Sequence, residues 1–159
     1  MQGMAKKLII LQGNPNIGKT TTLLRVIDSL MDERDFKAVK LPQKRKDQRI
    51  LLKNDQDFSI AICTAGDSLE IIEENYRFFL KNECDVMISA CSINVETHMD
   101  GSRTNLMKTG LIAFASGYWK SFEVHFNQDS EHVKIFTLYS QKDVGNMVQS
   151  IITEILMNG

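Results

Sequence analysis

An apolar run, a glycine-containing loop and an amphipathic helix follow one another near the start of the chain. Residues 7–11 (KLIIL) form a continuous apolar run, typical of a strand that is buried on both faces. After the loop, apolar residues recur at helical spacing until the charged cluster at 32–35; they are Leu23, Leu24, Ile27, Leu30 and Met31. A strand that leads through a tight loop into a helix predicts an α/β fold with that loop at the carboxyl end of the strand.

The loop itself has the spacing G-x-x-x-x-G-K-[ST] at every fixed position. Glycine permits a turn in which successive backbone N–H groups point into one concavity, and the start of the helix adds the positive end of its dipole. A polyphosphate is the anion that fits such a concavity. We expect the phosphate site to comprise Gly13, Asn14, Pro15, Asn16, Ile17, Gly18, Lys19, Thr20 and Thr21.

With this motif in this context, the chain resembles the P-loop NTPase superfamily, whose Walker A loop residues 13–20 would be. The resemblance covers about the first thirty residues firmly and the rest only by general layout. It implies a nucleoside triphosphate such as ATP, together with Mg²⁺, as ligands. Lys19 would reach the β and γ phosphates, the hydroxyl of Thr20 would coordinate Mg²⁺, and Thr21 would touch the α phosphate.

A second Mg²⁺ ligand is expected at the end of another apolar strand. Asp67 follows the run at 59–63 and resembles the Walker B carboxylate of P-loop proteins. The sequence Asp67-Ser-Leu-Glu70 is equally consistent with a helix capping box, in which Asp67 would accept from the backbone. Both interpretations of Asp67 stay open. A catalytic base among Glu70, Glu73 and Glu74 has less support, because the helix dipole alone favours acids in a first turn.

Two further features of the sequence could bind phosphate groups. The polar segment 94–103 follows the strand expected at 85–90, so it is a candidate substrate or lid loop, and its Arg103 could act as an arginine finger or be an ordinary surface residue. A basic stretch could bind a phosphorylated small-molecule acceptor or nucleic acid, or could be a solvated loop and a protected edge strand. It contains Lys37, Lys40, Lys44, Arg45, Lys46, Arg49 and Lys53.

The remaining pattern predicts the rest of the fold. Strands are expected at 36–41, 122–126 and 133–138, with a hairpin of 49–53 and 58–63 around the turn-prone 54–57. Helices are expected after residue 68, with an apolar face of Leu69, Ile72, Tyr76, Phe79 and Leu80, at 104–119, and at the carboxyl terminus. We expect one domain over residues 1–159, a three-layer α/β sandwich with a mostly parallel central sheet.

Composition narrows the choice of partners. The net charge of −1 gives no general attraction to nucleic acid or anionic membranes, and no apolar run approaches the roughly 20 residues that span a bilayer. The three cysteines, Cys63, Cys84 and Cys91, are odd in number and lack C-x-x-C spacing, so we expect reduced, mostly buried thiols in a cytoplasmic protein. His98, His125 and His132 are scattered, which predicts no metal site built by the protein alone.

Three functions remain compatible with the sequence. The guanine-reading N-K-x-D motif is absent, since residues 127–130 read NQDS, so ATP is favoured over GTP. The first hypothesis is a small Mg²⁺-dependent ATPase, and the second is a small-molecule or nucleotide kinase with the same donor site. The third is a nucleotide-binding regulatory module with little turnover.

Overall fold

The computed structural model describes residues 7–39, 49–93, 95–108, 110, 111, 113 and 132–158. Several expectations fall outside these residues: the strand at 122–126, the end of the helix at 104–119, and the basic residues between 40 and 46. The described part contains a six-stranded sheet in the order β2-β3-β4-β5-β1-β8. Its strands are β1 (Lys7–Gly13), β2 (Lys37–Ala38), β3 (Arg49–Lys53), β4 (Ser59–Cys63), β5 (Val86–Ser92) and β8 (Val133–Leu138).

The sheet is mixed, and the expectation of a mostly parallel sheet is wrong in this respect. β1 runs parallel to β5 and β8, and β4 runs parallel to β5, but β3 is antiparallel to both β2 and β4. The short connection between β3 and β4 explains the reversal, because a tight turn can join only antiparallel neighbours. The side chain of Asn54 accepts from the backbone N–H groups of Gln56 and Phe58 and fixes this turn, so the expected hairpin is confirmed.

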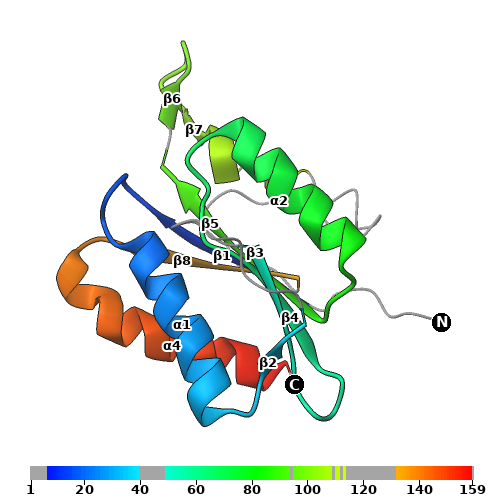
Figure 1. Ribbon diagram of the computed structural model, residues 1–159. Helices are drawn as coiled ribbons and strands as arrows, with labels where there is room; N and C mark the ends of the chain where they lie inside the picture. The colour runs from blue at the N-terminus through cyan, green and yellow to red at the C-terminus, as the bar shows by residue number, and fades with distance from the viewer. Residues whose placement is uncertain are drawn as a thin grey trace.

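Helices cover both faces of the sheet, as expected for a layered α/β fold (Figure 1). Helices α1 (Lys19–Glu33) and α4 (Val144–Met157) pack against each other and against one face, and α2 (Leu69–Lys81) covers the other. Each face has its own core. Leu23, Ile27 and Ile151 belong to the first core, and Ile72 and Phe79 belong to the second.

The apolar face of α2 differs from its expected composition. The buried positions of this helix are Ile72, Asn75 and Phe79, whereas Leu69 and Leu80 are 52% and 47% exposed. Leu80 follows Phe79 directly and is therefore turned about 100° away from the sheet. The central position of the buried stripe is thus an asparagine.

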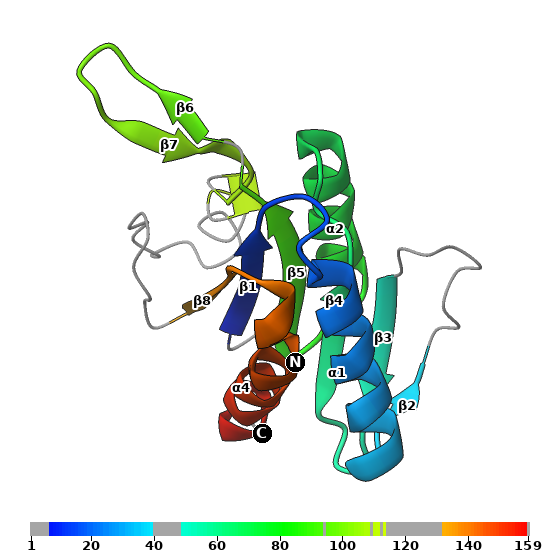
Figure 2. The same cartoon turned by 90° about the vertical axis from the view of Figure 1, so that its left-hand side faces the viewer.

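The segment expected to be a loop at 94–103 is largely a hairpin. Strands β6 (Val95–Thr97) and β7 (Arg103–Asn105) pair antiparallel as a separate two-stranded sheet. Figure 2 shows this hairpin projecting from the end of the molecule where β1 and β5 end. Because residues 103–105 pair with β6, the following helical residues start at 106 instead of the expected 104.

The three cysteines are free and buried, as expected. Burial raises the pKa of Cys84 and of Cys91 to about 12, so both thiols stay protonated at neutral pH. Within the described ranges, no helix combines the length and the apolar character needed to cross a bilayer.

Candidate functional site

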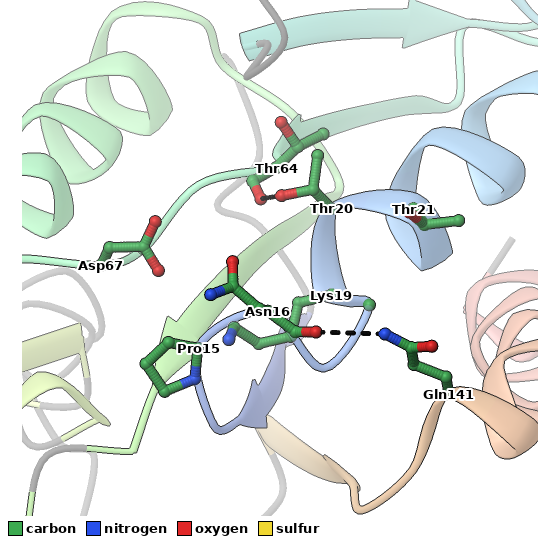
Figure 3. A pocket seen from close by; sticks show the side chains of 10 residues that line it. Pro15, Asn16, Lys19, Thr20, Thr21, Thr64, Asp67 and Gln141 are labelled. Carbon is green, nitrogen blue, oxygen red and sulfur yellow. Dashed lines mark hydrogen bonds between the residues drawn. The ribbon is translucent and has the colours of Figure 1, made fainter.

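A pocket of about 330 Å³ lies where the carboxyl ends of β1, β4 and β8 meet the start of α1 (Figure 3). Three chain segments form it: the glycine loop (residues 13–18) with the first turn of α1, the β4–α2 turn (residues 64–68), and the chain after β8. Polar groups dominate the lining, which comprises Pro15, Asn16, Gly18, Lys19, Thr20, Thr21, Thr64, Gly66, Asp67 and Gln141. Parallel strands place their carboxyl ends at one edge, which is why segments so distant in sequence converge there.

The glycine loop is curled tightly over the end of β1. Gly18 has φ 115° and Asn16 has φ 63°, a left-handed conformation that glycine and asparagine tolerate best. Gly13 faces a different constraint, because a Cβ there would lie 2.9 Å from the carbonyl oxygen of Leu138. Gly18 is also the N-cap of α1, and no side chain caps this helix start. The first turn of α1 therefore presents its positive dipole end toward the pocket.

Lys19, the first residue of α1, is folded back into the loop. Its side chain is buried, and its Nζ donates to the carbonyl oxygens of Gly13, at 3.0 Å, and Asn14, at 2.8 Å. Burial lowers the pKa of Lys19, and the nearby carboxylate of Asp67 offsets part of this shift. The ammonium group is thus a desolvated cation at the base of the glycine loop, held by neutral acceptors.

The β4–α2 turn forms the wall that faces the loop. The Thr20 hydroxyl donates to the backbone oxygen of Thr64 across a distance of 3.2 Å, which joins the start of α1 to this turn. Asp67 lines the pocket, and its Oδ1 accepts a 2.6 Å hydrogen bond from the hydroxyl of Ser92 at the end of β5. Ser92 therefore fixes the orientation of the Asp67 carboxylate.

The capping-box interpretation of Asp67 is wrong by one residue. The N-cap of α2 is Ser68, which has extended backbone angles and accepts from the N–H of Ile71 at 3.2 Å. Serine and aspartate cap helices about equally well, so the sequence could not decide between adjacent candidates. The Asp67 carboxylate does not cap α2 and lines the pocket instead (Figure 3).

Close packing holds the β4–α2 turn against β5. A Cβ on Gly66 would lie 1.9 Å from the carbonyl oxygen of Ala90, so only glycine fits. The backbone N–H of Ser92 donates to the oxygen of Gly66, and that of Ile93 donates to the oxygen of Gly13. The end of β5 thus binds both the β4–α2 turn and the glycine loop.

Other predicted candidates lie elsewhere. Arg103 is exposed on β7 and is not among the residues that line the pocket. Glu73 pairs with Arg77 at 2.6 Å, and Glu74 pairs with Arg49 at 2.9 Å, so these two acids have structural partners. Within the described part of the basic stretch, Arg49 and Lys53 also have acidic partners, Glu74 and Asp57.

Sequence reasoning missed four residues of this site: Thr64, Gly66, Ser92 and Gln141. Gln141 lines the pocket after β8 and donates from its amide to the backbone oxygen of Asn16 at 3.3 Å, while Ser92 orients Asp67. Each follows or ends a strand that was predicted, so a search for polar residues at the carboxyl ends of those strands would have found them.

The pocket offers hydroxyl, carboxylate and amide oxygens, which can bind a metal ion, and one buried ammonium group, which can bind an anion. No cluster of three or more His, Cys, Asp or Glu side chains suited to a metal occurs among the described residues. No protein-family model matches the chain, and no curated protein or solved structure matches it significantly. The chemistry of the pocket is therefore the basis for assigning it.

Proposed function

We propose that this chain is a P-loop NTPase that binds a nucleoside triphosphate together with Mg²⁺ and hydrolyses it, with ATP as the nucleotide. The observation that carries the proposal is the placement of a buried lysine at an uncapped helix start, opposite a carboxylate that does not cap α2. A cation, a helix dipole and an oriented carboxylate in one pocket match the needs of a polyphosphate with its metal ion.

The glycine loop would hold the phosphates. Lys19 exchanges its two carbonyl partners, Gly13 and Asn14, for phosphate oxygens, which are stronger acceptors because they are charged. The start of α1 adds its dipole to the same anion. Thr21 and Gln141 line the same pocket. Thr21 would contact the α phosphate, and Gln141 would contact the remainder of the nucleotide.

The residues present also fit Mg²⁺. Thr20 and Asp67 supply a hydroxyl and a carboxylate oxygen, the hard donors that this ion prefers. A pair of protein ligands is sufficient, because Mg²⁺ keeps much of its shell as water and phosphate oxygen. When bound, Mg²⁺ neutralises charge on the β and γ phosphates.

Hydrolysis then requires little from the protein beyond positioning and charge. A water oxygen forms a bond to the γ phosphorus while the bond from that phosphorus to the bridging oxygen breaks. The products are a nucleoside diphosphate and inorganic phosphate; one proton of the water stays on the phosphate, and the other is released to solvent. Lys19, which is itself buried, stabilises the transition state through its charge.

Phosphate release tests this proposal. We expect the protein to release inorganic phosphate from ATP when Mg²⁺ is present and no acceptor is added. A colorimetric phosphate assay measures this release directly. A parallel incubation with a pool of metabolites as possible acceptors shows whether turnover depends on an acceptor. Turnover that strictly requires an acceptor would instead identify a kinase, and tight binding without any release would identify a regulatory module.

The lowered pKa of Lys19 predicts a dependence of binding on pH. Phosphate binds the protonated lysine, so above the lowered pKa the protein must take up a proton on binding, and affinity falls as pH rises. The fall begins below the usual lysine pKa of about 10.4 and approaches tenfold per pH unit. Titration calorimetry between about pH 8 and about pH 10 measures it. A Lys19→Met variant should lack this alkaline loss, and an unchanged affinity of the wild type over that range would contradict the assignment.

A further inference from the structure

Asn75 is a polar residue at the centre of the buried face of α2. Its side chain is only 1% exposed, and it lies on the same helical stripe as Ile72 and Phe79. An amide buried without hydrogen-bond partners is costly, and an apolar residue would serve packing alone. The contacts of this amide therefore indicate what the position does.

Every polar end of the Asn75 amide has a partner. Its Nδ2 donates to the backbone oxygen of Ala65 at 2.7 Å and to the hydroxyl of Ser89 at 3.0 Å. Its Oδ1 accepts from Nε of Arg49 at 2.8 Å. Because the guanidinium can only donate, Arg49 forces the oxygen of the amide to its own side and the NH₂ group toward Ala65.

Ala65 connects Asn75 to the pocket. It lies between Thr64 and Gly66, both of which line the pocket, and Asp67 follows in the same turn. Asn75 therefore reaches this turn through the backbone oxygen of Ala65, and among the described residues its amide hydrogen bonds join no side chain that lines the pocket.

Arg49 is itself held in place. Its Nη2 pairs with Glu74 of α2 at 2.9 Å, and the first residue of β3 is thereby tied to α2 beside Asn75. Arg49, Asn75 and Ala65 thus form a chain of hydrogen bonds from the start of β3 to the β4–α2 turn.

We propose that Asn75 is a positioning residue for the β4–α2 turn, which carries the proposed Mg²⁺ ligand Asp67, and that Arg49 sets the orientation of the Asn75 amide. The inference rests on the proposed function. It assigns to Asn75 the placement of the turn that carries Asp67, whereas the glycine loop binds phosphate independently of this amide. Loss of Asn75 therefore weakens the contribution of Mg²⁺ to nucleotide binding more than it weakens binding without metal.

The test compares the affinity for ATP with and without Mg²⁺ in four proteins, by titration calorimetry. Asn75→Ala deletes the amide, and Asn75→Asp keeps an acceptor for Arg49 but opposes the oxygen of Ala65 with another oxygen. Asn82→Ala is the matched control, because Asn82 is also a buried asparagine of this helix region, capping its far end through the oxygen of Phe78 at 3.0 Å. Thermal unfolding confirms that each variant is folded.

We expect the ratio of the two affinities to fall about tenfold in Asn75→Ala and further in Asn75→Asp, as for the loss of a buried hydrogen bond. Asn82→Ala should lower the melting temperature and leave the ratio unchanged. If Asn75→Ala does not fold, Arg49→Lys replaces it, and the ratio should fall about threefold because the Nε donor is lost.

An unchanged ratio in folded Asn75 variants, or in Arg49→Lys, would overturn the inference while leaving the proposed function intact. The same holds if Asn82→Ala reduces the ratio as much as Asn75→Ala does. A wild-type protein whose ATP binding does not respond to Mg²⁺ would refute the proposed metal site, and this inference with it.

Discussion

Replacing Lys19 by alanine is expected to weaken the binding of ATP with Mg²⁺ by about 10- to 150-fold, since a charged hydrogen bond to phosphate is worth about 1.5–3 kcal/mol. Lys19 is only 6% exposed, and its Nζ donates to two carbonyl oxygens of the glycine loop. Among the described residues that line the pocket, it is the one basic residue. Titration calorimetry on the wild type and the variant measures the difference.

Two further variants control this result. Lys19→Met keeps most of the side-chain volume and should lose the same affinity, while its free energy of unfolding should not fall, because it removes a desolvated charge. Lys142→Met removes an exposed lysine next to the pocket residue Gln141 and should change the affinity less than about threefold. Equal binding by the wild type and Lys19→Met would refute the assignment of the phosphate site.

The second large effect is expected at Gly66. Gly66→Ala introduces a methyl group 1.9 Å from the carbonyl oxygen of Ala90, a backbone atom that cannot yield without moving β5. We expect the free energy of unfolding to fall by about 3 kcal/mol, at the upper end of ordinary overpacking. Because the β4–α2 turn must shift, the effect of Mg²⁺ on ATP affinity should fall as well. Urea denaturation and calorimetry measure the two effects.

Gly145 in α4 provides the matched control. A Cβ at this position meets no atom within 4 Å, so Gly145→Ala should raise the free energy of unfolding by about 0.5 kcal/mol through helix propensity. Its nucleotide affinity should not change. If Gly66→Ala were as stable as Gly145→Ala and bound ATP normally, the claim that the β4–α2 turn packs too closely on β5 to accept a Cβ at Gly66 would be contradicted.

Local sequence patterns were sufficient to predict the helix and strands around the glycine loop. The buried strand β1, the helix α1 and the β3–β4 hairpin each have a periodicity or turn signal within a few residues, and all are present. Of the nine residues that the loop spacing assigned to the phosphate site, six line the pocket: Pro15, Asn16, Gly18, Lys19, Thr20 and Thr21. These features depend on short-range preferences of the backbone, which can be recognised from the residue pattern of a single sequence.

The features that were missed depend on contacts between distant segments. The antiparallel pairing of β2 with β3, and the pairing of β6 with β7 that carries Arg103 away from the pocket lining, are set by tertiary structure. Ser68 rather than Asp67 caps α2, because the exact start of a helix depends on the path of the preceding turn. The role of Asn75 was hidden for the same reason, since its partners lie on other strands and in the turn.

Titration of the wild-type protein with ATP, ADP and AMP, each with and without Mg²⁺, tests the central claim most directly. The pocket geometry predicts that ATP with Mg²⁺ binds most tightly, that each phosphate removed weakens binding, and that Mg²⁺ strengthens the binding of ATP but not of AMP. Equal affinities for AMP and ATP, or no binding of any of the three, would contradict the proposal that the glycine loop and Lys19 form a triphosphate site.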